Sequence, residues 1–97
     1  MNKQELANKI VALGVGYAGI GEELGFFALN KEMYDNLSMC GMFPAEIFVC
    51  DWRVVGALLE KCLDAEIVLA LIMDEAMRNL GESLSLAITE ACVEALS

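Results

Sequence analysis

The stretch AEIVLALIMDEAMRNLG, residues 65–81, decides the fold class, because it fits two different structures. As a short apolar run, EIVLALIM suits a strand in a sheet that is buried on both faces. As a helix, the stretch places apolar side chains on one face at helical spacing: Leu69, Ile72, Met73, Ala76, Met77 and Leu80. The periodicity, together with the content of Ala, Leu, Met and Glu, favours the helix.

The N-terminal segment predicts a helix over residues 3–13. Asn2, with Glu5 three residues later, has the spacing of a capping box, and apolar residues recur behind it at helical spacing. Gly14 then stands where a left-handed residue is expected to end the helix.

Two further helices are expected in the second half of the chain. Asp51 is the predicted N-cap of a helix over residues 51–62, and Ser83 that of a helix over residues 84–96. The inward face of the first is expected to carry Trp52, Val55, Leu59 and Cys62. Gly56 lies beside that face and is expected to let another backbone approach closely. The inward face of the second is expected to carry Leu84, Ile88, Ala91 and Leu96, with Glu90 and Glu94 facing outward.

Dense glycines after residue 13 favour extended segments over a helix. Strands are expected over residues 17–22 and 25–30, and residues 31–44 are expected to form a loop that ends at the only proline, Pro44. These predictions give an α+β fold in a single domain over residues 1–97. Three helices (3–13, 51–62, 84–96) flank a small antiparallel sheet, and an all-α bundle with residues 65–80 helical is the alternative.

The charge balance excludes whole classes of function. The chain has 15 Asp and Glu against 6 Lys and Arg, a net charge of −9, and no histidine. Six scattered cations do not form the basic stripe that direct nucleic-acid binding needs. Without histidine there is no Ser-His or Cys-His nucleophile pair and no imidazole metal ligand. We therefore predict no catalytic, cofactor-binding or metal-binding residues and a protein that is not an enzyme.

Two motifs allow a functional interpretation, but we favour a purely structural one for each. Gly14, Gly16 and Gly19 have the G-x-G-x-x-G spacing of a dinucleotide-binding turn, but glycines continue beyond it, so we interpret it as a glycine turn into a hairpin. The four cysteines contain no Cys-x-x-Cys pair and are interpreted as free thiols that pack as small apolar residues.

The apolar content predicts an oligomer rather than a membrane protein. Hydrophobic residues make up 58% of the chain, yet the longest aliphatic run covers only residues 67–73. A membrane-spanning helix needs about 20 apolar residues. The segment MNKQELANK also lacks the basic-then-apolar order of a secretory signal. We expect a cytoplasmic protein whose surplus apolar surface is covered by another copy of itself.

Two stretches resemble a known family. FVCDWRVVGALLEKC, residues 48–62, and GESLSLAITEACVEALS, residues 81–97, are similar to blocks of small tailed-phage and prophage proteins of the phage ABA sandwich domain family. The resemblance implies helices flanking a small antiparallel sheet, in which residues 25–30 and 66–73 would be strands. It also implies a phage protein in the host cytoplasm, and it supplies no catalytic residues.

Two classes of function follow. The first is a small acidic phage accessory protein that binds another protein and inhibits a basic host factor of defence or nucleic-acid binding. Its candidate interaction residues are Glu22, Glu23, Trp52 and Glu94. The alternative is an oligomeric protein that sequesters a small ligand or a nucleotide signal. This second class requires cations to converge across a subunit interface, namely Arg53, Lys61 or Arg78.

Overall fold

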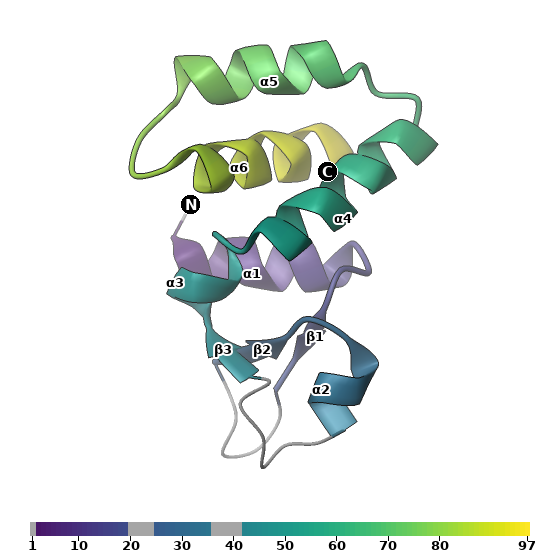
Figure 1. Ribbon diagram of the computed structural model, residues 1–97, viewed down its shortest axis with the longest axis vertical. Helices are drawn as coiled ribbons and strands as arrows, with labels where there is room; N and C mark the ends of the chain where they lie inside the picture. The colour runs from purple at the N-terminus through teal and green to yellow at the C-terminus, as the bar shows by residue number, and fades with distance from the viewer. Residues whose placement is uncertain (1, 20–24, 36–41) are drawn as a thin grey trace. The chain divides into compact units, whose positions relative to one another are not determined.

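The computed structural model describes residues 2–19, 25–35 and 42–97 (Figure 1). The chain divides into two compact units, which we call the N-terminal unit (residues 1–49) and the C-terminal unit (residues 50–97). The first combines short helices with a sheet, and the second consists of helices. The α+β fold class is therefore confirmed. The single domain over residues 1–97 stays a prediction.

The N-terminal unit begins with the predicted helix. Helix α1 covers Lys3–Ala12. The backbone N–H of Glu5 donates to Asn2 Oδ1 over 2.8 Å, and Asn2 Nδ2 donates to Glu5 Oε1 over 3.2 Å. The predicted cap is therefore present. Gly14 follows with a φ of 90°, which is the left-handed conformation expected at the end of the helix.

The sheet has three short antiparallel strands in the order β1-β2-β3. They are β1 (Tyr17–Ala18), β2 (Phe26–Ala28) and β3 (Met42–Pro44). Phe27 pairs with Phe43 across the second ladder. The strands β1 and β2 lie within the two predicted ones, and residues 20–22 of the first prediction lie outside the described residues.

The loop predicted over residues 31–44 is wrong at residues 31–35 and 42–44, and its residues 36–41 lie outside the described residues. Helix α2 covers Lys31–Asp35, where Lys31 Nζ lies 3.2 Å from Asp35 Oδ2 at i,i+4 spacing. This ion pair stabilises a helical turn, which the composition of residues 31–44 did not predict. Further on, β3 ends at Pro44, because proline lacks an N–H and fits the edge of a sheet. Helix α3 (Ala45–Phe48) follows at once.

The predicted glycine turn does enter a hairpin. Gly16 has a φ of 79°, and a Cβ there would lie 2.7 Å from Phe48 Cζ and 2.8 Å from the Ala28 carbonyl oxygen. Phe48 stacks on Phe27 with ring centroids 5.0 Å apart. Gly19 N–H then donates to the Phe26 carbonyl over 2.7 Å, at the end of the β1–β2 ladder. Gly16 therefore has a packing role in the core of the N-terminal unit.

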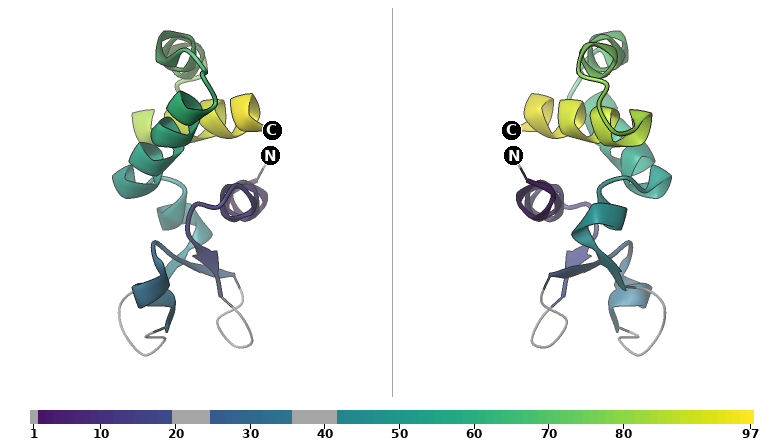
Figure 2. Two further views of the ribbon diagram at one scale, coloured as in Figure 1. Left: turned by 90° about the vertical axis from the view of Figure 1, so that its right-hand side faces the viewer. Right: turned by 90° about the vertical axis from the view of Figure 1, so that its left-hand side faces the viewer.

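The C-terminal unit has three helices, of which α4 (Trp52–Asp64) and α5 (Leu69–Arg78) both pack against α6 (Leu84–Leu96). Figure 2 views α5 nearly end-on while α6 runs across the picture, so these two helices cross rather than lie parallel. Both predicted caps are present: Arg53 N–H donates to Asp51 Oδ1 over 2.8 Å, and Leu86 N–H donates to Ser83 Oγ over 3.2 Å.

The contested segment is a helix. The predicted helix over residues 65–80 is confirmed as α5, and the strand that the family resemblance implies for residues 66–73 is wrong. Glu66 has a φ of 61° and turns the chain after α4. Val68 is then the N-cap of α5, which begins at Leu69. Ile72 and Ala76, one turn apart, are buried. Helical spacing is thus what buries apolar area here.

The inward faces of α4 and α5 differ from the predicted ones. The buried residues of α4 are Val54, Val55, Leu58 and Cys62. Trp52 is exposed and Leu59 is half-buried, so the buried face is rotated from the predicted one by part of a turn. Met73 and Met77 on α5, and Leu80 beyond its end, are exposed instead of inward.

Helix α6 matches its prediction in part. Ile88 and Ala91 are buried, and Glu90 and Glu94 are exposed as expected, but Leu84 is exposed. Most other positions over residues 85–93 are buried too, including Ser85 and Thr89. Among the described residues, no helix is long and apolar enough to span a bilayer.

Candidate protein-binding surface

Trp52 is the most exposed aromatic residue among those described, with 60% of its surface accessible. It is the first residue of α4, directly after the N-cap Asp51. Arg53 Nη2 and Nε donate to the Asp51 carboxylate over 2.9 and 3.0 Å, so the start of the helix is held by a bidentate pair. The core position predicted for Trp52 as one of two options is therefore wrong, and an interface position stays a prediction.

Helix α5 carries a second apolar stripe next to its buried one. Met73 and Met77, one turn apart on α5, are 38% and 59% exposed, and Leu80, which follows the C-cap Asn79, is 49% exposed. They adjoin the buried line of Ile72 and Ala76, because one residue step turns a helix by about 100°. The apolar arc of α5 is therefore wider than the face that α6 covers.

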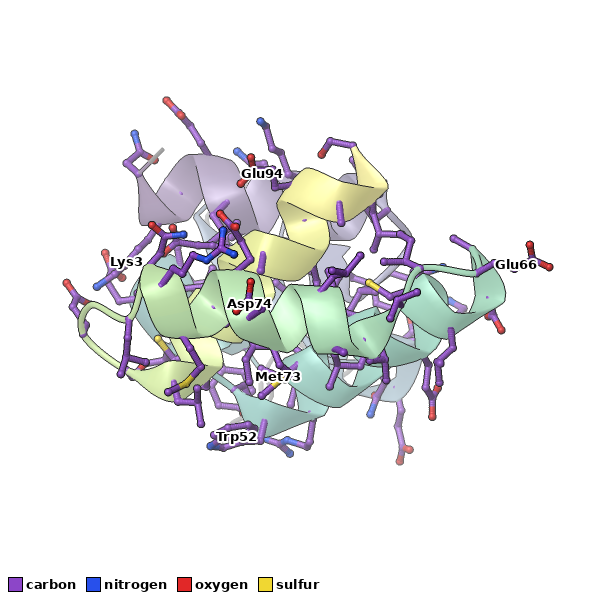
Figure 3. All side chains as sticks on the ribbon, turned by 90° about the horizontal axis from the view of Figure 1, so that it is seen from above. Lys3, Trp52, Glu66, Met73, Asp74 and Glu94 are labelled. Atoms are coloured by element: carbon purple, nitrogen blue, oxygen red, sulfur yellow. The ribbon has the colours of Figure 1, made fainter. Side chains whose placement is uncertain are left out.

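Helix α4 has the same organisation. Trp52, Gly56, Leu59 and Leu63 lie along one line beside the buried face, at i, i+4, i+7 and i+11. Leu63 is 57% exposed. Figure 3 shows Trp52 and Met73 on the same flank of the C-terminal unit, with Asp74 on the outer side of α5. We call the following set the apolar flank: Trp52, Leu59, Leu63, Met73, Met77 and Leu80.

Acidic residues border the apolar flank. Two aspartate–arginine pairs, Asp51–Arg53 and Asp74–Arg78, lie on its two helices. Exposed carboxylates follow on α4, in the α4–α5 connection and in the α5–α6 connection: Glu60 and Asp64, Glu66, and Glu82. The border therefore counts six acids against two arginines, and each arginine is already paired with an aspartate.

The Asp51 carboxylate of this border has a lowered pKa. Its hydrogen bonds from Arg53 lower the pKa from the ordinary value of 3.8, against a smaller opposing effect of burial. The carboxylate therefore stays ionised, and the Arg53 charge stays compensated, over the whole neutral range.

Glu94 lies on the other flank, opposite Trp52 (Figure 3). It lines a hollow of about 260 Å³ between α5 and α6 together with Glu75, Asn79 and Glu90. Asn79 Nδ2 donates to Glu75 Oε1 over 2.9 Å. The C-terminal unit as a whole has nine acids against Arg53, Lys61 and Arg78, a net charge of −6. This flank therefore contributes to the acidity of the C-terminal unit.

The other predicted interaction residues are not brought together. Glu22 and Glu23 lie outside the described residues. Of the three cations that a ligand-binding oligomer would need, Arg53 and Arg78 are held by aspartates, which reduces the charge that they offer to an anion. Among the residues described, no group of three or more Cys, Asp or Glu could hold a metal ion.

The cysteines of the C-terminal unit are free thiols, as predicted, and two of them are fully buried. Burial raises the pKa of Cys92 to about 12, with a smaller contribution from the neighbouring Cys62 thiol. A thiol with this pKa is protonated at neutral pH and is a poor nucleophile. Cys40 lies outside the described residues.

Sequence reasoning found Trp52 but missed the stripe on α5, whose methionines it placed in the core. One signal was present: seven apolar positions on a ten-residue helix span a wider arc than one neighbouring helix covers. Comparison of the chain with protein-family models, curated proteins and solved structures found no match. The features of the chain that indicate a function are therefore the apolar flank and its acidic border.

Proposed function

We propose that this chain is a non-enzymatic binding protein, and that the apolar flank is the surface on which a partner protein packs. The observation that carries the proposal is the exposure of Trp52 on the same flank as Met73. Tryptophan is among the residues that contribute most binding energy at interfaces, and methionine adapts its shape to different partners. Contiguous exposed apolar side chains with a polar border are typical of protein-binding sites.

The charge of the chain selects the partner in this proposal. A net charge of −9 creates a broad negative field, which speeds encounter with a basic protein. The apolar flank then slows dissociation, because its burial is independent of salt. Together with the resemblance to phage proteins, this favours a basic, nucleic-acid-binding factor of the host cytoplasm as the target. Self-association, expected from the apolar content, also stays a prediction.

A comparative capture experiment tests the proposal. The wild-type chain, the double variant Met73→Ser/Met77→Ser and the control Leu71→Ser are immobilised and exposed to the same bacterial lysate. Leu71 is 66% exposed on the same helix, but lies about 160° around it from Met73. Quantitative mass spectrometry is expected to identify proteins that the wild type and Leu71→Ser retain and the double variant loses. Equal retention by all three chains would overturn the proposal.

A further inference from the structure

We infer that the apolar flank receives a basic amphipathic helix, in which apolar residues face the flank and Lys or Arg residues face its border. This inference rests on the proposed function and names the kind of element that the surface recognises. The exposed apolar residues of α4 and those of α5 supply the apolar contacts of the site. A helix with apolar residues at i, i+3, i+4 and i+7 presents a matching stripe.

Gly56 supplies an observation that the fold of the chain leaves unused. It lies on the exposed stripe between Trp52 and Leu59, and apart from its chain neighbours and the nearby backbone of α4 itself, no described atom comes within 4 Å of the place where a Cβ would stand. Glycine in a helix interior is less stable than alanine, yet nothing in the described chain requires it here. The open space beside Trp52 gives a bulky partner side chain room to approach the α4 backbone.

Charge complementarity selects a basic helix over a second copy of this chain. The border has six acids and two arginines that are already paired. A second copy would bring the same acids against it, and the two chains carry a net charge of −9 each. Like charges placed face to face oppose association, whereas a row of lysines or arginines would be attracted. Salt distinguishes the two occupants, because it is expected to weaken the binding of a basic helix and to strengthen the binding of a second copy.

Trp52 is the only tryptophan of the chain and reports on its own surface. The probe is a tryptophan-free Leu/Lys peptide of about 18 residues with its leucines on one helical face. Two controls match it: a scrambled Leu/Lys peptide of the same composition, and a Leu/Glu peptide with the same apolar face. Only the first peptide is expected to shift Trp52 emission to shorter wavelength, with an affinity that falls about tenfold between about 20 and 200 mM salt.

Variants of the full-length chain locate the binding. Met77→Ser and Gly56→Leu are each expected to weaken the Leu/Lys peptide about tenfold, the first by loss of apolar contact and the second by filling the open space. Leu71→Ser is expected to leave the affinity unchanged. Far-ultraviolet circular dichroism of each variant, unchanged from wild type, confirms that the helices are intact.

Three results would overturn the inference. The first is equal binding of the scrambled peptide, and the second is equal binding of the Leu/Glu peptide. The third is a Trp52 emission shift that appears on concentrating the chain alone and strengthens with salt, which would assign the flank to a second copy. If the peptides fail while capture still depends on Met73 and Met77, the helix is wrong and the proposed function stands. If both experiments fail, both proposals fall.

Discussion

At the scale of single residues, Asp51 makes two stabilising interactions, because its carboxylate both caps α4 and pairs with Arg53. We expect Asp51→Ala to lower the free energy of unfolding by about 1 kcal/mol, the usual effect of losing an N-cap. Because the pKa of Asp51 is lowered from 3.8 in the folded chain, this stabilisation is complete above pH 3.8 and is lost as the pH falls further. Urea denaturation followed by circular dichroism at several pH values measures both effects.

Asp64→Ala is the matched control, since Asp64 is exposed at the other end of α4. A negative charge there opposes the helix dipole, so its removal is expected to be neutral or slightly stabilising. Equal destabilisation by the two variants at neutral pH would show that the cap has no special role. A difference between wild type and Asp51→Ala that persists unchanged below the folded pKa would contradict the ionic mechanism.

Substitution by alanine is expected to have opposite effects on stability at two glycines, Gly16 and Gly56. Gly16→Ala is expected to destabilise the chain by about 3 kcal/mol, through its positive φ and the clash with Phe48. Gly56→Ala is expected to stabilise it by about 1 kcal/mol, because the added methyl enters open space in a helix. The two changes are compared by urea denaturation, and a destabilising Gly56→Ala would contradict the exposure of this side of α4.

Residue-scale features were predictable where their cause is local. The caps at Asn2, Asp51 and Ser83 follow from a side chain and a backbone N–H two or three residues away, and each is present. Gly56 was predicted wrongly, because a close approach to a glycine depends on which elements pack around it. Adjacent sequence contains no such information.

At the scale of elements, periodicity identified the four longer helices α1, α4, α5 and α6 but not the orientation of α4 and α5. A helix with a narrow apolar stripe has one possible inward face, whereas α4 and α5 have broad apolar arcs that allow a rotation. The rotation decides whether Trp52 and Met73 are core or surface. The short strand β3 and helix α2 were missed, because a three-residue strand is defined by its pairing with β2 rather than by its own composition.

Substitutions on the two stripes of α5 test its orientation. Ile72→Ala is expected to lower the free energy of unfolding by about 3 kcal/mol, because Ile72 is buried and a cavity would remain. Met77→Ser, on the exposed stripe, is expected to change it by no more than about 0.5 kcal/mol. Comparable losses in urea denaturation would mean that Met77 is also core, and the apolar flank would not exist as described.

The packing of α4 on α6 predicts unreactive thiols at Cys62 and Cys92. In the background Cys40→Ser/Cys50→Ser, an aromatic disulfide reagent is expected to modify both thiols only as fast as the protein opens, and fully after denaturation. The pKa of Cys92, raised from 9.0 to about 12, keeps the thiol protonated. Since the unfolded thiol ionises first, stability from this group is full below pH 9.0 and is lost as the pH rises towards 12.

Rapid modification of the native protein at neutral pH would contradict the burial of both thiols. A free energy of unfolding that does not fall above pH 9.0, relative to a Cys92→Ser chain, would contradict the raised pKa of Cys92. Either result would remove the described contact between α4 and α6.

At the scale of the whole molecule, the sequence alone shows the net charge of −9 and the surplus of apolar residues. It does not show that exposed apolar side chains gather on one flank of the C-terminal unit, because that depends on how α4 and α5 pack against α6. Of the candidate residues, Trp52 lies on this flank and Glu94 on the opposite one. We propose that the acidic field sets the rate of association with a basic partner and that the apolar flank sets the lifetime of the complex.

Stopped-flow kinetics of Trp52 emission on mixing with the facially amphipathic Leu/Lys peptide test this division most directly. Between about 20 and 200 mM salt, the association rate is predicted to fall about tenfold or more, while the dissociation rate changes by less than about twofold. Met77→Ser is predicted to raise the dissociation rate and leave the association rate and its salt dependence intact. An association rate independent of salt, with the dissociation rate carrying all of the change, would contradict the account.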